Sequence, residues 1–284
     1  MRLKIADDFD LKKIADSGQC FRWSELPSGA YFIPYRDRSL IIKKISDEAT
    51  GFGTSESYGA LYELSCDESE YQNIWSPYLD MDEDYAKIRA LVDPKKDAFL
   101  HEAATSEQGI RILRQDLWET LISFIISQNR NIPAIKRSIE LLCKSCGELM
   151  TDAEGSAYYS FPSPEAVAAL SPEELDACRL GYRCRYIHET AAGVADGSIS
   201  FDRYDSLSDD ECMEKLMSIC GVGKKVASCV LLFGLHRIDA FPIDVWIKRI
   251  LENEYKDGYP MEEYRPYNGI YQQYMFAHYR QKTI

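Results

Sequence analysis

The stretch of sequence that decides the fold is SDDECMEKLMSICGVGKKVASCVLLFGL, residues 208–235. It opens with Ser208-x-x-Glu211, a capping-box pattern that is typical of a helix start. Apolar residues then recur at i, i+3, i+4 and i+7, once before and once after a pair of glycines: Met213, Leu216, Met217 and Cys220, then Val226, Cys229, Val230 and Phe233. This spacing predicts two amphipathic helices joined by a tight turn, a helical hairpin over residues 209–233.

The turn itself is Gly221-Val-Gly223. Glycines at these positions let the backbone come close to another backbone or to a phosphate. The second helix begins directly after the turn, so its free amide hydrogens and the positive end of its dipole form a site for an anion. A hairpin that only packs against its neighbours is the alternative interpretation of the same pattern.

Two residues beyond the turn favour the functional interpretation. Lys225 follows the second glycine, and Asp244 lies further along the chain within Phe241-Pro-Ile-Asp-Val-Trp246. The combination resembles the helix-hairpin-helix (HhH-GPD) superfamily of DNA glycosylases. In that superfamily the lysine of a G-x-G-x-K motif is the nucleophile and the downstream aspartate assists it, so the resemblance implies these roles for Lys225 and Asp244.

The resemblance narrows to the 8-oxoguanine DNA glycosylase/lyase family at four further stretches in the same order: Ser17–Trp23, Gly109–Asp116, Phe124–Asn131 and Leu180–Tyr186. It extends from Ser17 to Phe276 and implies an α+β fold. The expected domains are an antiparallel β domain over residues 1–98 and a helical glycosylase region over residues 99–284. The helical region would form two all-α lobes with the active site in the cleft between them.

Local patterns agree with that architecture. Four runs rich in aromatic and branched residues predict strands, and Tyr78–Val92 predicts a helix; the runs are Phe21–Trp23, Tyr31–Tyr35, Ser39–Ile45 and Ser57–Ser65. Asp116-x-x-Glu119 predicts the start of a helix over Leu117–Gln128. Further helix starts are predicted at Pro133, with Gly147 as the stop, and at Ser163-Pro and Ser171-Pro.

Lys225 must be an unprotonated amine to attack the sugar C1′ and form a Schiff base. The dipole of the following helix and the neighbouring Lys224 both disfavour an ammonium group there, whereas Asp244 favours one. Lys224 is the rival nucleophile, and a solvated surface lysine is the alternative without catalysis. Asp244 is expected to cap a helix, where a fixed carboxylate can stabilise an oxocarbenium-like sugar cation.

The resemblance implies a set of residues around the flipped base. Phe276 would stack on it and Gln272 would read its Watson–Crick edge, and the two share a helix face because they are four residues apart. The carbonyl of Gly18 would accept the N7–H that distinguishes 8-oxoguanine from guanine. Cys229, one turn beyond Lys225, either touches the base or is a core thiol.

DNA contacts are implied for a second set. Asn129 would fill the space left by the base, Tyr182 would wedge the stack, and Arg183 would donate to the estranged cytosine, with Gly221, Gly223 and Trp246 also at the DNA. Arg183 and the aromatic residues near it are otherwise a plain surface cluster. Trp246 replaces the histidine of the eukaryotic enzymes, Ala134 replaces their second arginine, and Arg130 replaces the middle asparagine of their N-N-N run.

Composition limits the remaining possibilities. The 284 residues carry 33 basic and 46 acidic side chains, a net charge of −13, so any affinity for DNA needs a local positive strip, expected from Arg183, Arg185, Lys224, Lys248 and Arg249. Nine cysteines, an odd number, predict no disulfide framework, and Cys143/Cys146 lacks the partners of a zinc site. No cysteine follows Cys229, which excludes the iron–sulfur cluster of related enzymes, and no cofactor or metal is expected.

Short apolar runs and an amino terminus without a signal core predict a cytoplasmic protein with no membrane segment, and the resemblance implies a nucleoid-associated bacterial protein. The sequence thus predicts a monomeric, bifunctional DNA glycosylase and lyase that acts on damaged double-stranded DNA and removes 8-oxoguanine. The alternatives are a monofunctional glycosylase for alkylated bases, which would use an aspartate without Lys225, and a non-catalytic helix-hairpin-helix module, which would not need Lys225 and Asp244 together.

Overall fold

The computed structural model describes residues 1–50 and 57–283, and the chain divides into two compact units. The first, here the sheet unit, comprises Met1–Ile33, Leu40–Arg114 and Ile238–Ile284. The second, the hairpin unit, comprises Pro34–Ser39 and Gln115–Arg237. The expected domains 1–98 and 99–284 stay a prediction, and the compact units place the segment from Ile238 onward with the sheet.

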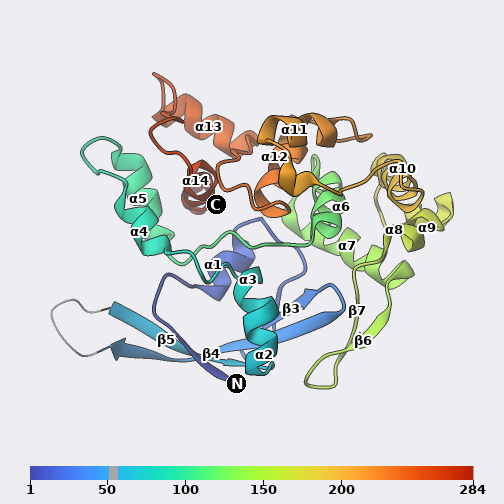
Figure 1. The fold of residues 1–284 in the computed structure, drawn as a ribbon, viewed down its shortest axis with the longest axis horizontal. Helices are drawn as coiled ribbons and strands as arrows, with labels where there is room; N and C mark the ends of the chain where they lie inside the picture. Colours follow the sequence, from blue (N-terminus) through green and yellow to red (C-terminus); the bar gives the residue numbers. More distant parts are fainter. Residues whose placement is uncertain (51–56, 284) are drawn as a thin grey trace. The chain divides into compact units, whose positions relative to one another are not determined.

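The sheet has five strands in the order β1-β5-β4-β3-β2 (Figure 1), namely β1 Arg2–Ile5, β2 Ser24–Glu25, β3 Tyr31–Tyr35, β4 Arg38–Thr50 and β5 Ser57–Leu64. The pairs β1–β5, β4–β5 and β2–β3 are antiparallel, and the register of β4–β5 shifts between Lys44 and Ser46. Leu40 and Ile42 are fully buried, which gives the sheet its apolar face. The predicted antiparallel sheet is confirmed.

Two predicted elements of this unit are wrong. Phe21–Trp23 is a loop, and its aromatic residues reflect burial instead of strand pairing: Trp23 is 2% exposed and donates from Nε1 to the hydroxyl of Tyr78. The single helix predicted over Tyr78–Val92 is two short helices, α3 Ser76–Tyr78 and α4 Tyr85–Ala90. The break lies at Asp80, whose positive φ of 53° no helix allows, and at Asp84, which caps α4.

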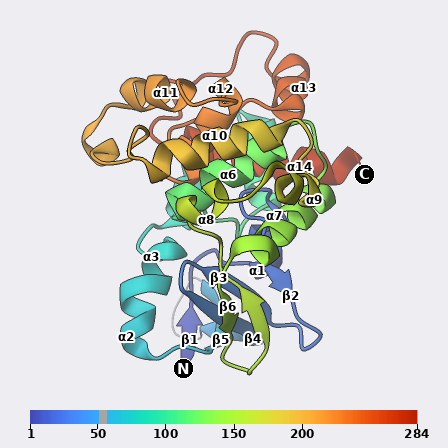
Figure 2. The ribbon, with the colours of Figure 1, turned by 90° about the vertical axis from the view of Figure 1, so that its right-hand side faces the viewer.

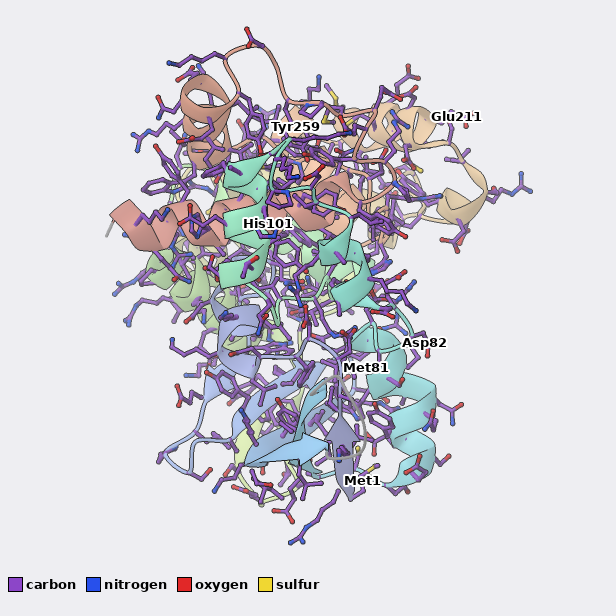
Figure 3. The ribbon with its side chains drawn as sticks, turned by 90° about the vertical axis from the view of Figure 1, so that its left-hand side faces the viewer. Met1, Met81, Asp82, His101, Glu211 and Tyr259 are labelled. Atoms are coloured by element: carbon purple, nitrogen blue, oxygen red, sulfur yellow. The ribbon has the colours of Figure 1, made fainter. Side chains whose placement is uncertain are left out.

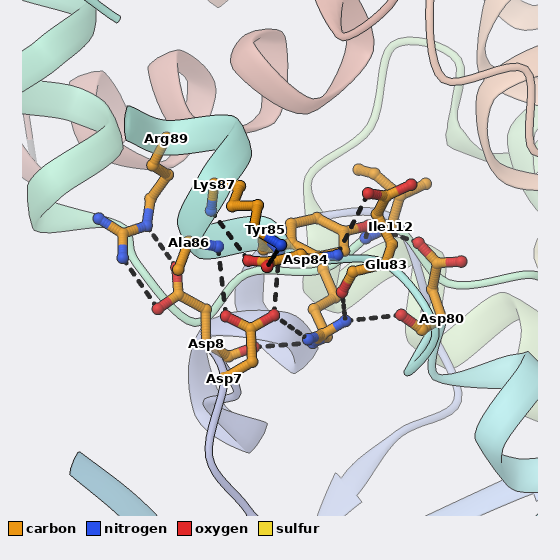
Figure 4. Close-up of polar contacts among 11 residues, drawn as sticks. Asp7, Asp8, Asp80, Glu83, Asp84, Tyr85, Ala86, Lys87, Arg89 and Ile112 are labelled. Carbon is orange, nitrogen blue, oxygen red and sulfur yellow. Dashed lines mark hydrogen bonds and ion pairs between the residues drawn. The ribbon is translucent and has the colours of Figure 1, made fainter. Parts of the chain in front are cut away.

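The break is held by a buried ionic network (Figure 4). Arg111 is fully buried, and its guanidinium donates to the carbonyls of Asp8 and Asp80 and to the carboxylate of Asp7, each at 2.6–2.7 Å. The same Asp7 carboxylate accepts from the backbone N–H of Tyr85 at the start of α4. Because two separate segments, one of them amino-terminal, satisfy one buried cation, the amino-terminal segment is fixed within the unit.

The remaining helices of the sheet unit are α1 Leu11–Asp16, α2 Glu68–Glu70, α5 Ala98–Ser106, α13 Val245–Glu254 and α14 Asn268–Thr283. A π-helical turn, Tyr71–Trp75, joins α2 to α3. Helix α14 packs against both α5 and α13. Helix α14 therefore connects α5 and α13 within the sheet unit.

The hairpin unit is mostly helical, with α6 Leu117–Ser127, α7 Ile132–Cys146, α8 Pro164–Ala168, α9 Pro172–Ala177, α10 Arg183–Ala195, α11 Asp209–Met217 and α12 Lys224–Phe233. A 3-10 turn, Tyr204–Ser206, and a small hairpin of β6 Leu149–Thr151 and β7 Ala157–Tyr159 complete it. Figure 2 shows α6 beside α7 and α10, in agreement with their contacts. The predicted helix starts at Asp116, Pro133, Ser163, Ser171 and Ser208 are confirmed, with complete capping boxes at Ser171 and Ser208.

The hairpin is confirmed, but the predicted stripe of its first helix is wrong in part. In α11 the buried residues are Cys212 and Leu216, whereas Met217 is 46% exposed and Cys220 lies beyond the helix end. The stripe of α12 is confirmed, since every residue from Val226 to Phe233 is buried. A helix buried on all faces is the centre of its unit, so periodicity alone underestimates its burial. Across the described residues, no helix combines the length and the apolar character that a membrane span requires.

Candidate active site

The hairpin turn uses its two glycines differently. Gly221 has a φ of +78°, and a Cβ added there would lie 2.4 Å from Cγ of Tyr186, so packing against α10 requires a glycine. Gly223 is the N-cap of α12 with ordinary extended backbone, and a Cβ there would meet nothing within 4 Å. The space beside Gly223 therefore leaves the first amides of α12 approachable, as an anion site requires.

Lys225 lies in the first turn of α12 and is half-buried, while Lys224 is exposed. The Nζ of Lys225 is 4.9 Å from the centroid of the Phe124 ring, which stacks on Phe233 at 5.5 Å. An amino group lies favourably over the face of an aromatic ring, so this contact holds Nζ in place. Of the two rival lysines, Lys225 is the one with a defined position.

Gln128, the C-cap of α6, connects this turn to the rest of the unit. Its Nε2 donates to the carbonyl of Gly221 at 3.1 Å, and its own carbonyl accepts from the guanidinium of Arg183. The next residue, Asn129, is exposed and has a φ of 49°. Gln128 thus connects three of the predicted DNA-binding residues, namely Asn129, Gly221 and Arg183. The sequence pattern had not identified Gln128.

Arg183 lies in a different environment from the one expected of a side chain that enters DNA. It is 4% exposed, donates to the carbonyl of Leu180, and lies 4.3 Å above the ring of Tyr182. Burial lowers the pKa of its guanidinium. Tyr182 itself is 54% exposed, so the aromatic ring is the accessible member of the pair. The role of Arg183 in reading cytosine stays a prediction.

The other expected DNA and base residues of this unit are also placed. Cys229 is buried in α12, one turn beyond Lys225. Arg130 donates to Ser138 Oγ at 2.6 Å and to the carbonyl of Arg179. Ala134 lies in the first turn of α7, where its amide donates to Asn131. Arg130 is therefore bound to its own unit in this structure.

In the sheet unit, Asp244 is the N-cap of α13, as expected. Its Oδ1 accepts from the backbone amides of Trp246 at 2.9 Å and Ile247 at 2.8 Å, so Oδ2 is not used in capping. The flanking Ile243 and Val245 are 50% and 66% exposed. The two cap bonds therefore fix the orientation of the Asp244 carboxylate, and its neighbours on both sides are exposed to solvent.

Aromatic packing fixes the loop that carries Asp244. Phe241 packs on Tyr259, which Figure 3 labels, with the ring centroids 4.9 Å apart and the planes tilted by 31°. Tyr259 packs in turn on Tyr255 and Tyr264. The hydroxyls of Tyr255 and Tyr264 both donate to Asp97, the N-cap of α5. Trp246 lies under Arg249, with the guanidinium 5.2 Å from its ring. The loop is thereby attached to two helices of its unit.

The three expected base residues of the sheet unit are brought together with this loop. Gly18 has a φ of +80°, and a Cβ there would lie 3.3 Å from Cε1 of Phe276, so Gly18 faces the ring. Gln272 is 3% exposed and donates from Nε2 to the carbonyl of Pro242 at 3.1 Å. Segments far apart in the sequence thus meet in one group. Gln273, which donates to Gln272, was missed, because adjacent helical residues do not share a face.

Two of the basic residues expected to bind DNA phosphates are already paired with carboxylates of the protein. Arg185 is paired with Glu189 at 2.6 Å and Lys248 with Glu252 at 3.9 Å, each within one helix. Among the residues that the structure describes, no three His, Cys, Asp or Glu side chains are placed to hold a metal ion. Cys143 is buried in α7 and Cys146 is half-buried.

Comparison with known proteins agrees with this geometry. Residues 122–256, which contain the hairpin, Lys225 and Asp244, match the HhH-GPD superfamily of base excision DNA repair proteins. The fold and the site therefore define the class as a helix-hairpin-helix base excision repair protein. Residues 2–121 match the N-terminal domain of 8-oxoguanine DNA glycosylase. The chain belongs to the 8-oxoguanine DNA glycosylase family.

Individual relatives support the same assignment. The N-glycosylase/DNA lyase of Saccharomyces cerevisiae is 43% identical over 174 residues, which are 57% of this chain and 46% of the yeast protein. The chain thus matches about half the length of that relative. The solved structure of Clostridium acetobutylicum 8-oxoguanine glycosylase/lyase, in complex with double-stranded DNA containing cytosine opposite 8-oxoguanine, has a TM-score of 0.85 and 31% identity, covering 100% of this chain and 99% of that one. The structure of MBOgg1 with a low affinity DNA ligand has a TM-score of 0.87 and 37% identity, covering 100% and 96%.

Proposed function

We propose that this protein is a DNA glycosylase and lyase that removes 8-oxoguanine from double-stranded DNA by way of a Schiff base on Lys225. The observation that carries the proposal is the position of Lys225: it is half-buried in the first turn of α12, directly after the glycine turn, and held over Phe124. A nucleophilic amine needs such a fixed position to attack the sugar carbon.

The chemistry assigned to the site has two steps. In the first, the bond between C1′ and the base breaks, the electron pair leaves with the base, and the neutral amine of Lys225 bonds to C1′. In the second, the C1′–O4′ bond breaks with its electron pair on O4′, which takes up an amine proton, and a protonated imine forms. The departed base, as an anion, takes the 2′ proton, and the C3′–O bond breaks with its electron pair on the leaving phosphate. Asp244 stabilises the positive charge that develops on the sugar during the first step.

The DNA partner is supported by the hairpin turn and the groups beside it. The open backbone at Gly223 and the start of α12 suit a backbone phosphate, and exposed Tyr182 suits a side chain that enters the base stack. Gly18, Gln272 and Phe276 form the group assigned to the extruded base. The solved relative from Clostridium acetobutylicum bound to an 8-oxoguanine duplex supports the same partner.

Borohydride trapping tests the proposal. The protein is incubated with a duplex that contains 8-oxoguanine opposite cytosine, and reduction then converts the imine into a stable covalent adduct. We expect an adduct with the unmodified protein and with Lys224→Gln, and none with Lys225→Gln, which should still bind the duplex. An adduct that survives Lys225→Gln and disappears in Lys224→Gln would contradict the assignment.

The same assay separates the alternatives. Excision of an alkylated base without any adduct would indicate a monofunctional glycosylase. Duplex binding without excision of either base would leave a non-catalytic helix-hairpin-helix module.

A further inference from the structure

The glycine assigned to the 8-oxoguanine lesion lies between two buried side chains of the sheet unit. Ser17 and Gln19 are each 1% exposed, whereas Gly18 between them is half-buried. The carbonyl of Gly18 belongs to the peptide that joins this residue to Gln19. The place of that carbonyl in the unit therefore depends on how the two buried neighbours are held.

Gln19 uses its whole side-chain amide to attach this loop to a distant segment of the sheet unit. Its Nε2 donates to the carbonyl of Arg111 and to Oγ of Ser17, and its Oε1 accepts from the backbone amide of Leu113, each at 2.8 Å. The two backbone partners determine which end of the amide is nitrogen, because a carbonyl only accepts and an N–H only donates. The hydroxyl of Ser17 in turn donates to the carbonyl of Ile14 in α1 at 2.8 Å. The loop is thereby attached to α1 at one end and to the distant segment at the other.

The segment that binds Gln19 is itself held by buried groups. The guanidinium of Arg111 is fully buried and donates to the carboxylate of Asp7 at 2.6 Å. The next residue, Ile112, donates its backbone amide to the hydroxyl of Tyr85 at 2.8 Å. Gln19 therefore attaches the loop to a part of the unit that has a fixed position of its own.

The other side of the loop faces the aromatic ring that is assigned to the base. A Cβ added at Gly18 would lie 3.3 Å from Cε1 of Phe276, so the glycine backbone and the ring are close neighbours. A base stacked on the ring meets the carbonyl of Gly18 at hydrogen-bonding distance only while the loop keeps this spacing. Because hydrogen bonds weaken steeply with distance and misalignment, a small withdrawal of the loop would lose the contact.

We propose that Gln19 is a positioning residue that holds the Gly18 carbonyl within reach of the N7–H of the bound lesion and so sets the preference for 8-oxoguanine over guanine. The inference rests on the proposed function of the site. Guanine presents a bare N7 acceptor where 8-oxoguanine presents N7–H, so the two bases differ at this carbonyl. A loop without its attachment would lose both the bond to the lesion and the repulsion that opposes guanine.

Two measurements on Gln19→Met, an apolar substitute of similar length, test the inference. In a Lys225→Gln background, which cannot excise the base, binding titrations compare duplexes with 8-oxoguanine or guanine opposite cytosine. We expect the ratio of the two affinities to fall about three- to tenfold, the range of one weakened hydrogen bond. With Lys225 present, single-turnover excision of 8-oxoguanine should slow by a similar factor. Cleavage of an abasic duplex, which has no base to bind, should stay within about twofold.

Ser17→Ala repeats the test with a smaller disturbance, and it decides the outcome if Gln19→Met folds poorly. It removes one of the three bonds of Gln19 and keeps both bonds to the distant segment. We therefore expect the ratio of affinities to fall about two- to threefold. Ser65→Ala is the matched control. The Oγ of Ser65 accepts from the backbone amide of Ile41 at 2.8 Å in the sheet, and its loss should leave the ratio unchanged.

Two results would overturn the inference. One is a ratio of affinities that stays unchanged in both Gln19→Met and Ser17→Ala, and the other is an equal slowing of base excision and abasic cleavage, which indicates a general disturbance of the site. An unmodified protein that neither prefers the 8-oxoguanine duplex nor excises the lesion would instead contradict the proposed function.

Discussion

The two compact units hold their functional residues by different means. In the hairpin unit, Lys225 and the glycine turn lie within a few residues of one another, and local features determine their geometry: a positive φ at Gly221 and a helix start at Gly223. In the sheet unit, Gly18, Asp244 and Gln272 come from three distant segments, joined by contacts such as that between Gln272 and Pro242. The comparison teaches that the proposed nucleophile is placed by a local motif, whereas the residues proposed to bind the base depend on long-range packing.

Substitution of Asp244 gives the largest expected effect, because this residue combines a helix cap with the proposed chemical role. Asp244→Asn keeps a side-chain oxygen that can accept from the amides of Trp246 and Ile247, but it removes the charge. We expect single-turnover excision to slow about 100- to 1000-fold, the scale of one lost electrostatic stabiliser, with little change in the free energy of unfolding. Asp244→Ala should add about 1 kcal/mol of destabilisation from the lost cap. An asparagine variant with nearly full activity would reduce Asp244 to a structural cap.

The glycine pair tests the local side of the comparison. Gly221→Ala imposes a positive φ on alanine and a clash with the ring of Tyr186, and should lower the free energy of unfolding by about 2–4 kcal/mol. Gly223→Ala meets no neighbour and should cost less than about 1 kcal/mol, while it weakens binding to duplex DNA. Urea denaturation and a binding titration measure the two effects. Equal destabilisation by both substitutions would show that the space beside Gly223 is not free in solution.

Selectivity for the opposite base should be looser than in the eukaryotic relatives. Ala134 offers only a methyl group where the family resemblance implies a second arginine in those enzymes, and Arg130 is bound to Ser138 and Arg179 in its own unit. One missing charge-assisted hydrogen bond corresponds to about 1.5–3 kcal/mol of lost discrimination. We therefore expect excision rates opposite adenine or guanine within about tenfold of the rate opposite cytosine, measured in single turnovers. A preference of several hundredfold for cytosine would require a second reader of that base.

The smallest expected effect concerns the pH dependence of the contact between α5 and α14. Burial lowers the pKa of His278 below its ordinary value of 6.5, the nearby Lys282 lowers it further, and Glu102 opposes the shift. The Nδ1 of His278 lies 2.7 Å from Ser106 Oγ, and its ring contacts Phe99. The folded state thus disfavours the protonated ring, so this stability is complete above pH 6.5 and is lost as the pH falls below it.

One proton limits the slope to about 1.4 kcal/mol per pH unit. We expect the urea midpoint to fall between pH 7 and pH 5, and His278→Gln to remove part of that fall. An identical pH profile for the variant and the unmodified protein would assign the effect to other groups.

The predictions from sequence were wrong at two places where burial, and not the periodicity of apolar residues, decides the backbone conformation. The aromatic run Phe21–Trp23 has the composition of a strand but fills the core as a loop. Tyr78–Val92 has helical periodicity, yet the buried guanidinium of Arg111 binds the carbonyl of Asp80 and breaks the helix there. A long-range ionic contact of this kind leaves no periodic pattern, so a single sequence could not reveal it.

By itself, the sequence determined the helical hairpin, the caps that begin its helices, the antiparallel sheet and the family, because these depend on residues that lie close together along the chain or recur in a fixed order. Only the tertiary structure decided that Arg183 is buried against Tyr182, that Lys225 lies over Phe124, and that Gln272 is hydrogen-bonded to Pro242 and Gln273. The physical reason is the distance along the chain over which each kind of interaction acts. Propensity, capping and turn geometry act over a few residues, whereas the direction of a side chain and the polarity of its surroundings depend on segments that meet only after folding.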